Sequence, residues 1–352
     1  MPEETDGRLR ELELVGGSGE RRTRSGDGLT GIKRRRLNAA TEIRSMRTTR
    51  PDYIHSALAN VYLPMRDPGE RRVWYRTNGA VSMRIAAGSI EDTVQPAGWR
   101  DLGLPWGSRA RLILIYLTTE ARRTGSPCVE VGASMLAFMR RLGLDGRGRD
   151  YADIRDQLQR LAVAQIAMAF PGDGGRRQVN GPLIEEMPLW SATDAQTHRL
   201  LWQEEVVLSE RFFRTVMAHA VPLDERAIAA LKNSPLGLDV YAWMASRLCR
   251  IEDGRADFVP WDALKGQFGQ EFGRLRRFRQ AFREVLERVL AFYAEAAPSV
   301  SDGEAGLTLR YAPPPCCRGR DCVLRRGRRP SRKAQTVRQR APKCARTSPT
   351  IH

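Results

Sequence analysis

The sequence predicts a mainly helical fold with small β-hairpins, an α+β class, built from two similar folded units between basic ends. The clearest evidence is the segment 275–293, where apolar side chains recur at helical spacing and arginines occupy the opposite side. A short helix, a glycine and a longer helix occur in the same order earlier in the chain, near residues 133–162. Most of the formal net charge of +17 lies outside both units.

The positive charge is concentrated at the two ends of the 352-residue chain. Residues 1–50 hold twelve Lys and Arg against eight acids, and residues 316–352 hold twelve against one. Residues 51–315 are therefore nearly neutral, with about +2 of the +17. Both ends lack apolar periodicity, which predicts disordered arms over 1–50 and 315–352. Basic arms around a nearly neutral centre suit a polyanionic partner, nucleic acid above all.

Residues 51–100 are expected to form a separate N-terminal region built around a β-hairpin. Apolar residues alternate with polar ones on both sides of Asn78-Gly79. This dipeptide is typical of the two-residue turns that join antiparallel strands.

The first folded unit is predicted to span residues 101–208. Its helices are expected at 108–123, in a short segment ending at Gly143, and from about Asp150 onward. Its strands are expected at 128–131, 164–170 and 206–208. The last two strands should pair as a hairpin whose exposed, basic tip contains Arg176 and Arg177.

The second folded unit is predicted to span residues 209–314 and to repeat this order. Its helices are expected at 234–250, 261–268 and 275–291. Ser234 and Pro235 suit the first of them as N-cap and first residue. Extended segments are expected at 257–260, 291–297 and 306–311. Helix, strand, helix, turn, helix and hairpin is the order of a winged helix, so we predict two in tandem.

The helix at 275–291 is the better candidate to read DNA bases. Its outer side carries Arg276, Arg277, Arg279, Gln280 and Arg283. Arginine can hydrogen bond guanine, and glutamine adenine, through two atoms each. Arg279 and Arg283 fall nearly opposite the apolar stripe and are expected to be free of the core. A solvated or ion-paired side chain is the ordinary alternative for each arginine.

The first unit offers weaker candidates. The outer side of its long helix is mixed, with Arg149, Ala152, Asp156, Gln159 and Arg160. Arg176 and Arg177 are candidates for phosphate contact. Arg109 and Arg111 either stabilise a helix start or contact phosphate. The tryptophans Trp106, Trp243 and Trp261 are expected in the core.

Catalytic, metal and membrane functions find little support in the sequence. The four histidines form no metal-binding pair, the cysteine spacing does not match a zinc site, and no phosphate-binding loop is present. We therefore expect no catalytic residue, no metal, no cofactor and no enzymatic activity. The sequence has neither a signal peptide nor an apolar run of about 18 residues, so we expect a cytoplasmic, bacterial protein that does not bind membranes.

Short segments between about Gly103 and Pro314 together point to a known family. They are Leu104 to Leu112 (LPWGSRARL), Leu117 to Ala121, Phe138 to Leu144, Val221 to Asp224, Ser234 to Leu236 with Leu238 to Tyr241, Trp261, Gln267 to Gly269, Phe278 and Phe282. In this order they resemble the plasmid-encoded RepA replication initiators. The resemblance implies a protein that binds repeated double-stranded sites at a plasmid origin and helps to open the duplex. It also implies recruitment of a host replicative helicase or initiator protein.

Two other functions remain open at this point. A winged-helix transcriptional repressor without a role in replication is the main alternative. An RNA-binding protein is less favoured, because the aromatic residues fall in core stripes and not on an exposed sheet. The sequence leaves the choice between monomer and homodimer undecided.

Overall fold

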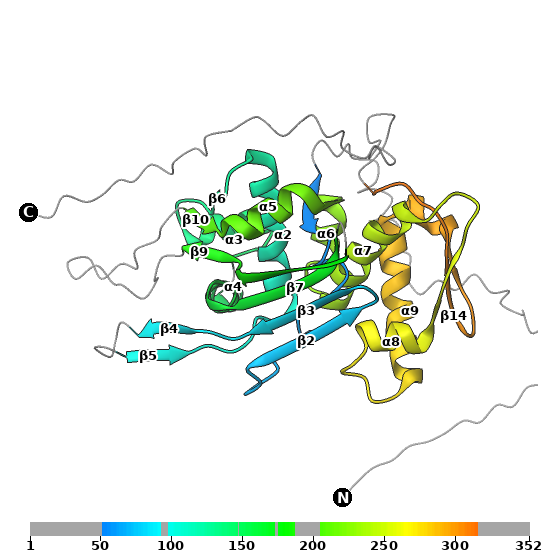
Figure 1. Cartoon of the computed structure of the whole chain (residues 1–352), viewed down its shortest axis with the longest axis horizontal. Coiled ribbons are helices and arrows are strands. Elements are labelled where there is room, and N and C mark those ends of the chain that lie inside the picture. Colours follow the sequence, from blue (N-terminus) through cyan, green and yellow to red (C-terminus); the bar gives the residue numbers. More distant parts are fainter. Residues whose placement is uncertain (1–50, 93–97, 147, 173–174, 187–204, 316–352) are drawn as a thin grey trace, which may run out of the picture.

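The computed structural model describes residues 51–92, 98–146, 148–172, 175–186 and 205–315 (Figure 1). These residues form a mixture of helices and strands, which confirms the predicted α+β class. The predicted arms lie outside the described residues, except for the single position 315. None of the described helices is long and apolar enough to cross a membrane.

Two buried helices lie at the centre of the fold, α2 (Gly107–Thr124) and α7 (Pro235–Arg247). Helix α2 ends as predicted at Gly125, whose φ of 67° suits a residue without a side chain. At the start of α7 the Ser234 hydroxyl accepts a hydrogen bond from the Gly237 backbone N–H, and Pro235 is the first residue. Both helices are buried on nearly all sides, which makes them the common core of the two units.

The first unit arranges three helices beside a three-stranded sheet. Its further elements are β6 (Cys128–Glu130), α3 (Met135–Arg141), α4 (Gly148–Val163), β9 (Ile184–Glu186) and β10 (Glu205–Leu208). The strand order is β6-β10-β9, and every pair is antiparallel. The chain between β9 and β10 lies outside the described residues.

The predicted pairing of residues 164–170 with 206–208 is wrong. Strand β7 (Gln165–Gly172) instead pairs with β8 (Gly175–Pro182) and with β3 (Val81–Ala86). With β2 (Val73–Asn78) these strands form a four-stranded antiparallel sheet in the order β2-β3-β7-β8. The β2–β3 hairpin turns at Gly79 with a φ of 55°, which confirms the prediction from Asn78-Gly79. Ile166 and Met168 of β7 are buried in the core together with Met83 and Ile85 of β3, which explains why β7 joins this sheet.

The second unit has the same strand order as the first, except that β7 and β8 follow α4 in the first unit only. Its elements are β12 (Asp257–Pro260), α8 (Trp261–Phe268), α9 (Leu275–Phe292), β13 (Val300–Asp302) and β14 (Gly306–Leu309). The sheet order β12-β14-β13 matches β6-β10-β9 of the first unit. The expected strand at 291–297 is wrong, because α9 and the 3-10 helix η2 (Ala294–Ser299) occupy those residues.

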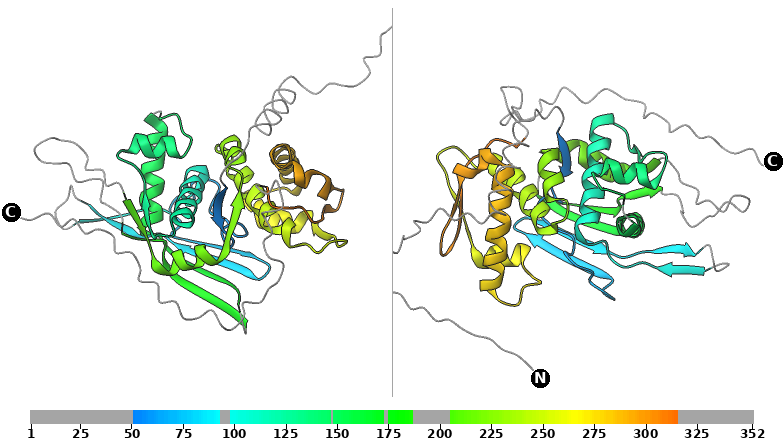
Figure 2. Two further views of the ribbon diagram at one scale, coloured as in Figure 1. Left: turned by 90° about the horizontal axis from the view of Figure 1, so that it is seen from above. Right: turned by 180° about the vertical axis from the view of Figure 1, so that it is seen from behind.

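Smaller elements tie these parts together. They are β1 (Asp52–His55), β4 (Ser89–Asp92), β5 (Gly98–Asp101), α5 (Glu210–His219), β11 (Ala220–Leu223), α6 (Glu225–Leu231) and η1 (Leu248–Arg250). Strand β1 pairs with β11 at the junction of the two units. Strands β4 and β5 form a ribbon that extends away from the helices, and α8 and α9 lie at the opposite end of the molecule (Figures 1 and 2).

Candidate nucleic-acid interface

Helices α8 and α9 pack through a cluster of aromatic rings. Trp261 and Phe268 of α8 meet Phe278 and Phe282 of α9 with ring centroids 5.5–6.5 Å apart. Gly269, at the end of α8, permits this approach, since a Cβ at this position would lie 2.3 Å from Cδ2 of Phe278. The predicted inner side of α9 is thus confirmed, and the rigid cluster fixes the direction of the helix.

The N-terminal half of α9 presents basic side chains to solvent. Arg276, Arg277 and Gln280 are exposed, and so is Arg274 at the N-cap position. The first turn contains no acidic residue, and the first acid in the helix is Glu284. A helix N-terminus carries partial positive charge, so arginines there oppose the helix dipole. The arrangement is unfavourable for an isolated helix and favourable for holding a polyanion.

Arg279 and Arg283 are engaged within the protein, contrary to expectation. Their guanidinium carbons lie 5.3 and 5.1 Å from the ring centroid of Trp261. Nε of Arg283 is 2.7 Å from Oδ2 of Asp302, and its Nη2 is 3.1 Å from Oδ1. The indole N–H of Trp261 donates to the Gly303 carbonyl over 3.0 Å.

These contacts join α9 to the turn between β13 and β14. The prediction that Arg279 and Arg283 are free of internal contacts is therefore wrong. The side chain of Arg283 is 40% exposed, so part of it still faces solvent. The arrangement makes the two arginines positioning residues for the turn, and leaves Arg276, Arg277 and Gln280 as the most accessible candidates on the helix.

The turn between α8 and α9 is fixed to the four-stranded sheet. The Arg76 guanidinium donates to the Gln270 side-chain oxygen and lies 4.0 Å from the ring centroid of Trp74. Burial lowers the pKa of Arg76 to about 10, which leaves it charged near neutrality. Glu271 accepts a hydrogen bond of 3.0 Å from the Met65 backbone N–H. The start of α9 is thus held from both sides.

Helix α4 of the first unit is a poorer candidate. Arg149 and Ala152 are exposed as expected, but Gln159 is only 5% exposed. Arg160 pairs with Asp156 at 2.9 Å and donates to the Leu104 carbonyl at 3.2 Å. These contacts occupy Asp156 and Arg160, and burial removes Gln159 from the outer side, so Arg149 is the one polar residue of the predicted set that stays exposed.

Arg109 and Arg111 make internal contacts near the start of α2, which favours the predicted helix-start role over phosphate contact. Arg109 lies 2.6 Å from Asp150 and also donates to Asn233, with its side chain 17% exposed. Arg111 is 4% exposed and makes a two-pronged ion pair with Asp239 at 2.6 and 2.7 Å. This buried pair connects α2 to α7, so Arg111 has no guanidinium surface for a phosphate.

Arg176 and Arg177 belong to the β7–β8 hairpin, and not to the predicted hairpin of residues 164–170 with 206–208. Arg176 and Arg177 are exposed on β8, next to the hairpin tip. Trp243 and Trp261 are buried, and Trp106 is partly buried. Over the described part of the chain, no group of three or more His, Cys, Asp or Glu could hold a metal ion.

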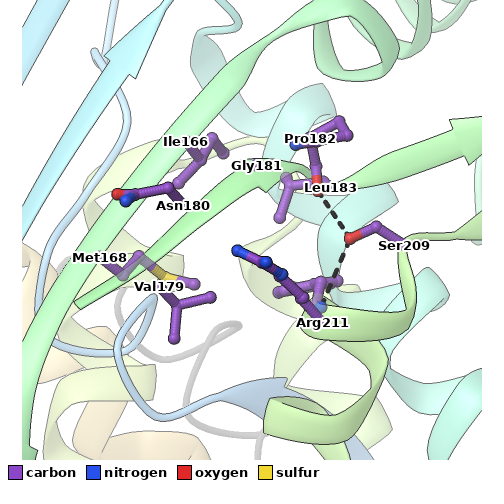
Figure 3. Close-up of a pocket in the computed structure, with 10 residues that line it drawn as sticks. Ile166, Met168, Val179, Asn180, Gly181, Pro182, Leu183, Ser209 and Arg211 are labelled. Carbon is purple, nitrogen blue, oxygen red and sulfur yellow. Dashed lines mark hydrogen bonds between the residues drawn. The ribbon is translucent and has the colours of Figure 1, made fainter. Parts of the chain in front are cut away.

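A small pocket separates α5 from the four-stranded sheet (Figure 3). Ile166, Met168 and Val179 line it from the sheet, and Arg211 lies across from them. The Ser209 hydroxyl closes one end by donating to the Pro182 carbonyl over 2.7 Å. No predicted site residue lines this pocket, which instead marks the inner, helix-covered side of the sheet.

Comparisons with known proteins bear on residues 104–263, which match the family model described as plasmid-encoded RepA protein. No curated protein matches the chain. Among solved structures, domains 2 and 3 of RctB align with a TM-score of 0.44 and 12% identity, covering 72% of this chain and 96% of that one. A second crystal structure of the same RctB domains aligns with a TM-score of 0.41 and 11% identity. This alignment covers 72% of this chain and 94% of that one. Likeness at this level is too slight to support a functional argument.

The family match is shorter than the resemblance predicted from the sequence. It includes the segments from Leu104 to Tyr241 and reaches Trp261, but ends before Gln267, Phe278 and Phe282. Helix α9 therefore stands outside it, and the case for α9 rests on its geometry and charge. Over residues 104–263, this chain is similar to the plasmid-encoded RepA family.

Proposed function

We propose that this protein initiates plasmid replication by binding repeated duplex sites at an origin. In this proposal the two units are tandem winged helices, and α9 of the second enters the major groove. The protein then helps to open the duplex and recruits a host helicase or initiator protein. The observation that carries the proposal is the exposed, uncapped and acid-free N-terminal half of α9, with Arg274, Arg276 and Arg277.

The charge distribution supports a division of labour between the units. Arg276, Arg277 and Gln280 can reach base edges, where each two-atom hydrogen bond contributes about 1–3 kcal/mol of discrimination. In the first unit, Asp156 and Arg160 neutralise each other, so that unit is better suited to backbone or subunit contacts. The turn between β13 and β14, tethered to α9 through Arg283, is placed to follow the helix onto the duplex.

Direct binding tests this role of α9. We expect Arg276→Gln and Arg277→Gln to reduce the preference for origin duplex over scrambled duplex by about 5- to 150-fold each. The origin duplex is taken from the DNA that flanks the gene. Arg214→Gln is the matched control, since Arg214 is a 68% exposed helical arginine on α5. Equal loss in the control, or an unchanged ratio in both α9 variants, would refute base reading by α9.

A replication assay tests the function as a whole. The gene and its flanking DNA are placed on a selectable DNA circle that lacks an origin. Autonomous replication that requires the intact gene supports an initiator. Repression of a promoter in the same DNA, without replication, would instead establish a transcriptional repressor. The concentration dependence of the sedimentation coefficient, with and without origin DNA, then decides between monomer and homodimer.

A further inference from the structure

The four-stranded sheet is a positively charged element of its own. Strands β2, β3, β7 and β8 contain four arginines and no acidic residue. By contrast, the adjacent β4–β5 ribbon contains Glu91, Asp92 and Asp101 against the single Arg100. The positive charge of the sheet is thus a local property, and none of it comes from the basic arms.

The two sides of this sheet differ sharply. On the inner side, Trp74, Ile85 and Met168 are buried in the core. Alternation places Tyr75, Arg84 and Arg176 on the outer side, where all three are exposed. The outer positions of the four strands include no acid and a single large aromatic ring, that of Tyr75.

Register brings the outer residues into rows across the strands. Tyr75 pairs with Arg84, Arg84 with Ala167, and Ala167 with Asn180. The Arg84 guanidinium carbon is 6.0 Å from the Tyr75 ring centroid, and the Tyr75 residue is 63% exposed. In the next row, Ser82 pairs with Ala169 and Ala169 with Gln178. On the same side of the sheet, Nη2 of Arg176 donates a hydrogen bond of 3.4 Å to Oγ of Ser82.

We propose that this outer side of the sheet is a second DNA-binding surface, specific for single strands. An exposed ring on a flat sheet can stack on a base whose faces are free, which is the case only for an unpaired strand. Arg84 and Arg176 supply charge for the phosphates on either side of the ring. Asn180 and Gln178 offer amides to base edges, and Ala167 leaves room for a base to lie flat.

Charge excludes the other occupants that a sheet face commonly takes. A second copy of this chain would set the arginines of two sheets against each other, with no acids to offset them. An apolar protein surface would find one large ring and otherwise polar or small side chains. The choice of DNA over RNA rests on the proposed function, since an opened origin supplies single-stranded DNA. The surface itself is independent of α9.

The test is binding of the full chain to a fluorescent, mixed-sequence 20-nucleotide DNA strand. RNA of the same sequence and the corresponding duplex are measured in parallel. We expect Tyr75→Leu to weaken single-strand binding by about 5- to 150-fold, the effect of losing one stacked base. We expect Arg84→Gln to reduce the salt slope by about 0.7, the value for one phosphate contact on a single strand.

Two control variants separate this surface from other sites. Trp99→Leu removes a 74% exposed ring from the acidic ribbon and should leave single-strand binding unchanged. Arg276→Gln should weaken origin-duplex binding and leave single-strand binding intact, so failure of the α9 proposal would show in the duplex arm alone. Photocrosslinking to iodouracil-substituted DNA should place the adduct at Tyr75.

Three results would overturn the proposal. The first is wild-type single-strand affinity in both Tyr75→Leu and Arg84→Gln. The second is an equal loss in Trp99→Leu, which would indicate a general effect of removing exposed rings. The third is tighter binding of RNA than of DNA by wild type with the same dependence on Tyr75, which would assign the surface to RNA.

Discussion

Arg111→Met is expected to destabilise the protein more than any change at the surface. All five guanidinium N–H groups of Arg111 are used: two bind Asp239, and three bind the carbonyls of Leu63, Pro64 and Gly107. The two side chains are 4% and 7% exposed. Methionine fills a similar volume, so the variant isolates the loss of charge and hydrogen bonds from the loss of packing.

The expected loss follows from what the variant leaves behind. Asp239 would stay buried without a countercharge, and breaking a buried ion pair in this way costs about 3–5 kcal/mol. Whole domains are stable by only about 5–15 kcal/mol, so the folded population itself is at risk. Replacing both partners, as in Arg111→Met with Asp239→Leu, removes the unpaired charge and should recover most of the loss.

The pH dependence of the free energy of unfolding provides a second test of this prediction. Burial raises the pKa of Asp239, while the charge and hydrogen bonds of Arg111 oppose that rise. Without Arg111, only the charge of Arg76 still opposes the effect of burial, so the pKa of Asp239 rises further. The native carboxyl group then keeps a proton that the unfolded one loses near pH 4, so the stability of Arg111→Met should fall as pH rises above about 4.

Urea unfolding of wild type, both single variants and the double variant provides the measurement, at pH 5 and at pH 7. A coupling energy below about 1 kcal/mol would refute the reasoning, because directly paired buried groups should couple more strongly than that. A loss in Arg111→Met that is the same at both pH values would refute the account of the unpaired Asp239 carboxylate.

Three further predictions concern other parts of the fold. Gly269→Ala should lower stability by about 1–3 kcal/mol, since its Cβ would fall 2.3 Å from the Phe278 ring, and an unchanged melting temperature would contradict this. Arg283→Ala should lower stability by no more than about 1 kcal/mol, because its pair with Asp302 is partly exposed, yet it should speed amide exchange in the β13–β14 turn. Asp302→Asn should speed the same exchange, and protection equal to wild type in both variants would disprove the tether. Burial lowers the pKa of His55 to about 3, whereas the pKa of this histidine in the unfolded chain is near 6.5. The contribution of the neutral side chain to stability is complete above pH 6.5 and should be lost as pH falls from 6.5 toward 3. In His55→Gln the midpoint of unfolding should change less with pH over that range than in wild type. Parallel pH profiles for wild type and His55→Gln would contradict the role of His55.

Most of the longer helices were predictable because their signals are local, whereas α5 and α6 were not predicted. The stripe of Phe278, Phe282 and Val285 identifies the inner side of α9 from spacing alone, and Ser234-Pro235 identifies the start of α7. The β2–β3 hairpin was predictable for the same reason, since Asn78 ends β2 and Gly79 begins the turn. In each case the residues that carry the signal are neighbours along the chain.

The pairing of β7 with β3 could not be predicted, because it joins residues about 80 positions apart. The exposure of the Tyr75 ring could not be predicted either. The alternation of apolar and polar residues around Tyr75 predicts a strand, but only the assembled sheet shows which of its sides the helices cover. The use of Arg283 by the β13–β14 turn is likewise a tertiary contact, invisible in the spacing of α9.

One missed feature did have a signal in the sequence. Arg111 is the only charged residue in the apolar run from Ala110 to Leu117, and Asp239 is the only one from Pro235 to Ser246. A lone charge inside a helix that is otherwise apolar must find a partner when the helix is buried. Two such helices with opposite lone charges predict that the charges pair, and hence that α2 contacts α7.

The pairing of β1 with β11 has a consequence for how the chain is made. Asp52 sits opposite Leu223, so β1 leaves the ribosome well before its partner strand exists. At about 5–20 residues per second, the wait for those residues is on the order of 10–30 seconds. Throughout that interval the apolar segment that follows β1, with Leu58, Val61 and Leu63, has no finished core to enter. The first half of the nascent chain therefore gains a complete core only after β11 has been synthesised.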